Sequence, residues 1–141
     1  MFTDPRLALE PPWLKAQILN TPPHLDISGT AKLVMDVQRA GGRIVAGTDQ
    51  PGPMYMHAEL LSYVRFGMTP YEALRTATVT PANFLRLDAG TIAPGKLADI
   101  VLVEGDPLLD IANASKVRRV IANGRMFTLE DLLSGKAKDQ H

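Results

Sequence analysis

Apolar and polar positions in the first half of this chain follow a helical pattern and then a strand pattern. Between residues 30 and 40 the apolar residues fall on one helical face, and Gly41 stands where a helix C-cap is expected. The run over residues 43–48 is then almost wholly apolar, and it ends at Asp49. Such a run predicts a strand of a parallel sheet, buried on both faces.

The next segment carries signals for three further helices. A Gln-Pro-Gly-Pro sequence over residues 50–53 predicts a loop, and a helix is expected over about residues 57–66. The sequence Thr-Pro-Tyr-Glu at residues 69–72 is typical of a capping box, which predicts a helix over residues 70–78. A Thr-Pro pair at residues 80 and 81 then starts another short helix.

After residue 87 the chain takes on the character of antiparallel strands. The run at residues 100–103 predicts one strand, and residues 117–127 predict a hairpin that turns at Asn123-Gly124. A last helix is expected to begin at residues 128–131. Because these strands would not continue a βα repeat, they are expected to form a second, all-β layer.

Composition narrows the class of protein. The 141 residues are 45% hydrophobic, which suits one packed domain, and 15 basic residues balance 15 acidic ones, which argues against nucleic-acid and anionic membrane partners. The absence of cysteine excludes disulfides, thiolate metal sites and a thiol nucleophile. The sequence has no run of about 20 apolar residues and no signal-peptide pattern at its start, so a cytoplasmic protein is expected.

Asp49 is the first candidate for chemistry. In a (β/α) barrel the C-terminal ends of the strands carry the active site, so an acid that ends a buried strand would face it. Gly47 would let backbone or ligand approach closely. The alternative is that Asp49 is a turn or helix-cap residue, and the local pattern alone leaves both interpretations open.

Short motifs in fixed order point to a known family. The sequences Gly-Thr-Asp at residues 47–49, His-Ala-Glu-Leu at 57–60, and the segment 69–78 resemble the end of the catalytic barrel in metal-dependent amidohydrolases. The segment 90–99 resembles that family's return from the barrel into its β-sandwich, and residues 105–108 and 120–125 resemble the sandwich strands that follow. Residues 57–60 are similar to the imidazolonepropionase-like and prolidase-like branch. The chain lacks the asparagine pair and Asp-Met of the branch that deaminates purine-like rings.

The resemblance, which covers roughly residues 30–127, implies an α/β fold. The chain would hold the C-terminal βα units of a (β/α)8 TIM-type barrel followed by strands of a small β-sandwich. A complete barrel needs about 250 residues, so a C-terminal fragment of a larger fold is expected. The expected divisions are an irregular proline-rich arm (1–29), the end of the barrel (30–88), sandwich strands (89–127), and a C-terminal helix and tail (128–141).

The resemblance also implies a metal site at Asp49. In the family this aspartate binds the catalytic divalent metal, expected to be zinc, and exchanges a proton with the attacking water. The family's other ligands, a His-x-His pair among them, are absent, because the only histidines are His24, His57 and His141. The isolated chain should therefore bind zinc weakly or not at all. His57 either contacts substrate or fixes its loop by hydrogen bonding.

These implications give two functional hypotheses. The first is a metal-dependent hydrolase that cleaves a C–N bond of a small amide, dipeptide or cyclic amide by metal-activated water, present here as a C-terminal fragment inactive alone. The second is an autonomous, non-catalytic structural or interaction module. Under the first hypothesis the isolated chain should self-associate or bind the missing N-terminal part of the enzyme.

Overall fold

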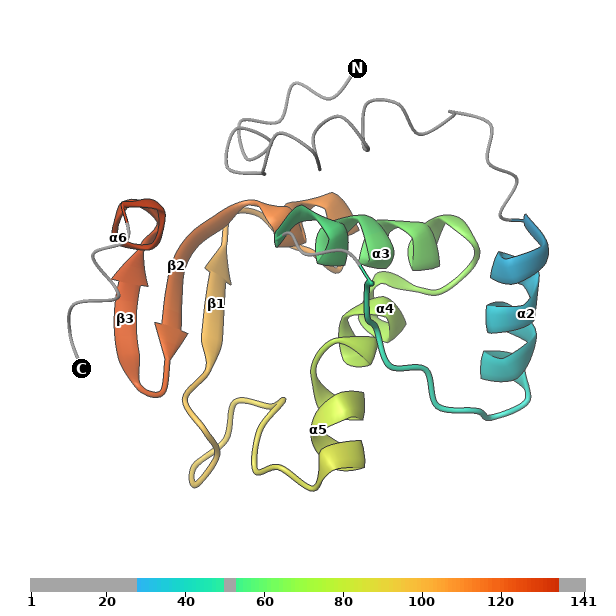
Figure 1. Cartoon of the computed structure of the whole chain (residues 1–141), viewed down its shortest axis with the longest axis horizontal. Helices are drawn as coiled ribbons and strands as arrows, with labels where there is room; N and C mark the ends of the chain where they lie inside the picture. The colour runs from blue at the N-terminus through green and yellow to red at the C-terminus, as the bar shows by residue number, and fades with distance from the viewer. Residues whose placement is uncertain (1–27, 50–52, 135–141) are drawn as a thin grey trace, which may run out of the picture.

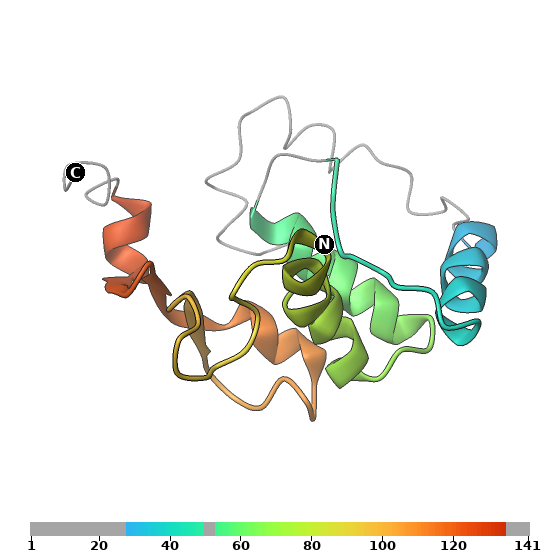
Figure 2. The ribbon, with the colours of Figure 1, turned by 90° about the horizontal axis from the view of Figure 1, so that it is seen from below.

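The computed structural model describes residues 28–49 and 53–134. Its elements, in chain order, are α2 (Ser28–Arg39), α3 (Pro53–Arg65), α4 (Pro70–Thr76), α5 (Val79–Leu85), β1 (Ile100–Val103), the 3-10 helix η2 (Ile111–Ser115), β2 (Val117–Ala122), β3 (Arg125–Thr128) and α6 (Leu129–Leu133). Figure 1 shows α2 to α5 on one side and the sheet with α6 on the other. In Figure 2, α2 and α6 again lie at opposite ends of the molecule.

Helix α2 ends at the predicted glycine. Gly41 has a positive φ of 82°, which a residue with a side chain adopts only at a cost. Its N–H donates to the carbonyl of Gln38, and the N–H of Gly42 donates to the carbonyl of Val37. This pair of bonds is the Schellman arrangement, which satisfies carbonyls left over at the end of a helix. The expected arm at residues 1–29 lies outside the described residues, except that Ser28 already begins α2.

The other predicted helices are present with shifted bounds. Helix α3 begins at Pro53, earlier than expected, because a proline in the first turn lacks only an N–H that has no partner within the helix. The capping box of α4 is confirmed: the Glu72 N–H donates to Thr69 Oγ1 (3.2 Å), and the Thr69 N–H donates to Glu72 Oε2 (2.7 Å). Helix α4 ends at Thr76, two residues before the predicted end.

The strand predicted over residues 43–48 is wrong. This segment has no regular secondary structure, and its burial alternates, with Ile44 and Ala46 half-buried and Val45 exposed. The Ala46 N–H donates to the carbonyl of Thr76 (2.9 Å), which ties the segment to the end of α4. A strand needs a neighbouring strand to pair its backbone groups. Among the described residues, no strand lies beside this segment.

The three strands form one antiparallel sheet in the order β1-β2-β3. Ile100 pairs with Ile121, and Val120 pairs with Phe127. The predicted hairpin is confirmed, since Asn123 and Gly124 both have positive φ (49° and 78°), as a two-residue turn of type I′ requires. The described residues hold this single sheet, so the second sheet of a sandwich and the complete barrel stay predictions.

The core lies between the helices and η2, a short helix that the sequence analysis did not predict. Asp110 begins η2, and its side chain accepts a hydrogen bond from the Ala112 N–H (2.9 Å). The helix brings Ile111 against α3, which connects the sheet half of the molecule to the helical half. Ile44 and Ala46 pack on the same cluster. Its buried members are Met35, Leu60, Tyr63, Met68, Ala73 and Ile111.

Candidate functional site

Asp49 directly follows the segment that packs on the core. Ile44 and Ala46 hold this segment against the buried cluster, and the bond from Ala46 to Thr76 fixes its path past α4. The Asp49 side chain is exposed to solvent. Asp49 therefore follows a segment that is not a strand, and its place in an active site at the end of a barrel strand stays a prediction.

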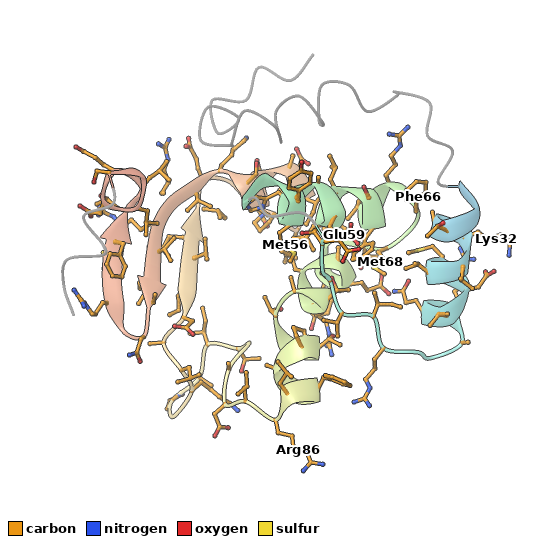
Figure 3. The ribbon with its side chains drawn as sticks, in the orientation of Figure 1. Lys32, Met56, Glu59, Phe66, Met68 and Arg86 are labelled. Atoms are coloured by element: carbon orange, nitrogen blue, oxygen red, sulfur yellow. The ribbon has the colours of Figure 1, made fainter. Side chains whose placement is uncertain are left out.

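His57 lies in the first half of α3 and is half-buried. It lines a cavity of about 420 Å³ between α3, α4 and β1, as does its neighbour Met56. In Figure 3, Met56 lies on the side of α3 nearer the sheet. Asp49 is not among the residues that line this cavity. The structure thus brings His57 beside β1 and does not bring it together with Asp49 in a shared cavity. A role for His57 in binding substrate stays a prediction.

Asp99, the acidic residue of this cavity, already has a structural partner. The N–H of Asn123 donates to its Oδ1 (2.6 Å), and the N–H of Gly124 donates to the carbonyl of Ala98 (3.0 Å). These bonds hold the hairpin turn against the start of β1. Asp99 therefore positions the sheet, in agreement with its place in a motif that joins two layers of the fold.

The described residues do not form a complete metal site. Across residues 28–49 and 53–134, no three His, Cys, Asp or Glu side chains come together in a way that could hold a metal ion. A catalytic zinc takes about three protein ligands, and Asp49 supplies one carboxylate. His24 and His141 lie outside the described residues. Within the described part of the chain, the side chains present do not fit a metal without further ligands.

A buried tyrosine belongs to the core cluster on which the segment before Asp49 packs. Tyr63 belongs to the core cluster, and burial, together with the Glu59 carboxylate one turn earlier on α3, raises its pKa above the ordinary range of a tyrosine. Figure 3 labels Glu59 on this helix. The spacing of four residues between an acid and a tyrosine is the sequence signal for this pair. A tyrosine that stays protonated packs as a neutral core residue, so Tyr63 contributes to the cluster on which Ile44 and Ala46 pack.

A second, more polar cavity of about 210 Å³ lies between α2, α4 and α5. Its lining includes Arg43, Glu72 and Arg75. The pKa of Glu72 is lowered by hydrogen bonds from the backbone and side chain of Thr69, so this carboxylate is already engaged as the cap of α4. No sequence motif marked this cavity.

None of the described helices is long and apolar enough to cross a membrane.

Most of this chain matches the sequence model of one protein family. The sequence model described as "Amidohydrolase family" matches residues 24–127. An adenine deaminase from Methanosphaera stadtmanae is 44% identical over 71 residues, covering 50% of this chain and 12% of that protein. An imidazolonepropionase from Deinococcus deserti is 40% identical over 90 residues, covering 57% of this chain and 23% of that protein.

Two solved structures are also similar to most of this chain. A Xaa-Pro dipeptidase crystallised with methionine in its active site has 31% sequence identity and a TM-score of 0.65, over 70% of this chain and 25% of that one. An amidohydrolase from Thermotoga maritima has 29% identity and a TM-score of 0.61, over 78% of this chain and 30% of that one. The chain thus spans less than a third of each of these relatives.

Proposed function

Because this chain belongs to the amidohydrolase family, we propose that it supplies part of a metal-dependent hydrolase that cleaves a C–N bond. The observation that carries the proposal is Asp49. It is an exposed carboxylate at the end of a segment anchored on the core, and it lies inside the matched residues 24–127. A carboxylate oxygen held in this way is a suitable ligand for zinc or a similar divalent ion.

In this proposal Asp49 is one ligand of the metal and the group that exchanges a proton with the attacking water. The remaining ligands come from parts of the fold outside the described residues, because those residues hold no cluster of three ligands. The chemistry that a bound metal supplies is a water whose pKa is lowered toward neutrality. The chain's own contribution is to hold the carboxylate in place through Ile44, Ala46 and the bond to Thr76.

The substrate class is proposed from the relatives. A Xaa-Pro dipeptidase and an imidazolonepropionase among them support a small amide, dipeptide or cyclic amide. The adenine deaminases support a second candidate, removal of an amino group, at identities as high as 44%. Both reactions break a C–N bond with water. His57, which lines the cavity beside β1, stays a candidate for substrate contact.

A chimera tests this proposal. In it, residues 28–134 of this chain replace the matching segment of the Deinococcus deserti imidazolonepropionase, and activity on that enzyme's own substrate is measured along with its metal content. We expect activity that Asp49→Asn reduces by about a hundredfold or more. The matched control is Asp88→Asn, since that side chain is highly exposed and, within the described part of the chain, forms an ion pair with Lys96 at the surface.

Three outcomes of this experiment decide between the hypotheses. A folded chimera without activity would favour the alternative, an autonomous structural or interaction module. Full activity of the Asp49→Asn variant would remove Asp49 from the site while leaving the family function in place. Ammonia release from adenine by the chimera, without activity on the host enzyme's substrate, would favour the deaminase candidate.

A further inference from the structure

The polar cavity between α2, α4 and α5 brings two arginines together. We name it the arginine cavity, and its volume is about 210 Å³. Its lining includes the side chains of Gln38, Arg43, Glu72, Arg75, Thr80 and Asn83. The buried Met68, labelled in Figure 3, is part of the apolar lining. Asp49 is not among the lining residues, so the arginine cavity is separate from the candidate metal ligand.

The two arginines are held in place by different elements. Arg43 directly follows the turn that ends α2, where the Gly42 N–H donates to the carbonyl of Val37. Arg75 lies on α4, and its Nη1 donates to the Tyr71 hydroxyl (3.3 Å) while its guanidinium carbon lies 5.6 Å from the centre of the Tyr71 ring. A guanidinium has several N–H donors in a rigid plane, so this contact orients Arg75 and leaves donors for a ligand.

Neither arginine has an acidic partner within residues 28–49 and 53–134. The ion pairs found there are formed instead by Lys32, Arg39, Lys96 and Arg118. Glu72, the acid of the lining, directs its Oε2 to Thr69, whose N–H and hydroxyl both donate to it (2.7 and 2.8 Å). Two guanidinium charges and one carboxylate charge leave the lining with a net positive charge at neutral pH. The cavity therefore favours an anion.

The arrangement of donors favours a phosphate group over a carboxylate. Each guanidinium can hold a pair of oxygens, and a phosphate group has enough oxygens for two guanidinium groups, whereas a carboxylate has a single pair. Thr80 and Asn83 are three residues apart on α5, which places them on the same face of that helix. Their hydroxyl and amide groups add uncharged donors beside the two arginines.

We propose that the arginine cavity binds a phosphate group between Arg43 and Arg75, supplied by inorganic phosphate or by a small phosphate ester. Thr80 and Asn83 donate further hydrogen bonds to it. The volume of about 210 Å³ lies below the range of about 300–1,000 Å³ that is typical of ligand pockets, so the phosphate group and not a large attached group fills the cavity. Because Asp49 takes no part, the site goes beyond the proposed hydrolase function and does not depend on it.

Calorimetric titration of the 141-residue chain with inorganic phosphate, at neutral pH and constant ionic strength, tests the proposal. We expect saturable one-to-one binding, and acetate should bind about tenfold more weakly or less tightly still. Arg43→Gln and Arg75→Gln should each weaken phosphate binding about tenfold or more. Glycerol phosphate is titrated in parallel. Either anion that saturates the cavity supports the site, and the tighter of the two identifies the source of the phosphate group.

A third variant should change the affinity in the opposite direction. Glu72→Gln removes the negative charge from the lining, and a glutamine at this position still completes a capping box with Thr69. Phosphate affinity should therefore rise about threefold or more. An unchanged or lower affinity in a folded Glu72→Gln variant would show that phosphate does not bind beside this carboxylate.

The matched control is Arg86→Gln, which removes the same charge at the end of α5. Arg86 is not among the lining residues, and in Figure 3 its side chain points away from α4. This variant should leave phosphate affinity unchanged, and circular dichroism confirms that all four variants fold. Phosphate binding that does not saturate, equal weakening by Arg43→Gln and Arg86→Gln, or acetate bound as tightly as phosphate would each overturn the proposal.

Discussion

Residues 117–128 form a two-stranded hairpin, whereas residues 43–48, which are also rich in β-branched and small apolar side chains, run without regular structure. The hairpin contains its own partner, since β2 and β3 are joined by the two-residue turn Asn123-Gly124. In the described part of the chain, a backbone bond from Ala46 to Thr76 ties the segment 43–48 to α4, and the side chains of Ile44 and Ala46 pack on the core cluster. An apolar run thus becomes a strand only where a neighbour can pair with it.

The largest effect is expected from removing the packing beneath residues 43–48. Leu60 is 4% exposed and belongs to the cluster on which Ile44 and Ala46 pack, so Leu60→Ala should lower the free energy of unfolding by about 2–5 kcal/mol. Chemical denaturation measures this loss. The control is Leu61→Ala on the same helix, where the side chain is exposed and the loss should stay below about 1 kcal/mol. Equal losses of stability in the two variants would show that the buried cluster does not stabilise residues 43–48.

Two glycines, one in the hairpin turn and one in the segment 43–48, compare how strongly the backbone is constrained in each region. Gly124 has a positive φ of 78°, so Gly124→Ala should cost about 1–2 kcal/mol. Gly47 lies in the segment without regular structure, and no atom lies within 4 Å of the position of an added Cβ, so Gly47→Ala should change stability by less than about 0.5 kcal/mol. Thermal unfolding compares the two variants. A larger cost at Gly47 would mean that residues 43–48 are more tightly constrained than the hairpin.

The features that could be predicted from the sequence are those whose interaction partners lie close along the chain. The capping box at Thr69, the cap at Gly41 and the turn at Asn123-Gly124 were predictable because each is completed within a few residues. The strand predicted at residues 43–48 was wrong, because an apolar run does not by itself show whether a second strand lies beside it. The cavity of about 420 Å³ beside β1 could not be predicted either, because α3, α4 and β1 come together around it only after folding.

The cap of α4 should have a smaller effect. Thr69→Ala removes the hydroxyl that accepts from the Glu72 N–H, at a cost of about 1 kcal/mol, whereas Thr69→Ser keeps it. Because the carbonyl of Thr76 at the end of this helix holds Ala46, the variant should also speed amide exchange at Ala46 and leave the hairpin unchanged. Equal acceleration in the hairpin would contradict this separation of the two regions.

The smallest expected effect is a loss of stability at alkaline pH, and it is absent at neutral pH. The pKa of Tyr63 is raised in the folded chain, so the stability it contributes is complete below about pH 10, the ordinary tyrosine pKa, and is lost as the pH rises above that value. The hairpin contains no tyrosine, so helical amides should lose protection first in an alkaline titration. Tyr63→Phe should remove this dependence. An unchanged profile in that variant would assign the alkaline transition to another group.

Amide hydrogen exchange of the isolated chain tests the central claim most directly, namely that the segment leading to Asp49 has no strand partner among the described residues, whereas the hairpin carries its partner within itself. We predict that the amides of residues 43–47, apart from Ala46, exchange rapidly while those of β2 and β3 that pair across the sheet are protected. Protection of residues 43–47 equal to that of β2, in a chain shown to be monomeric, would contradict the account.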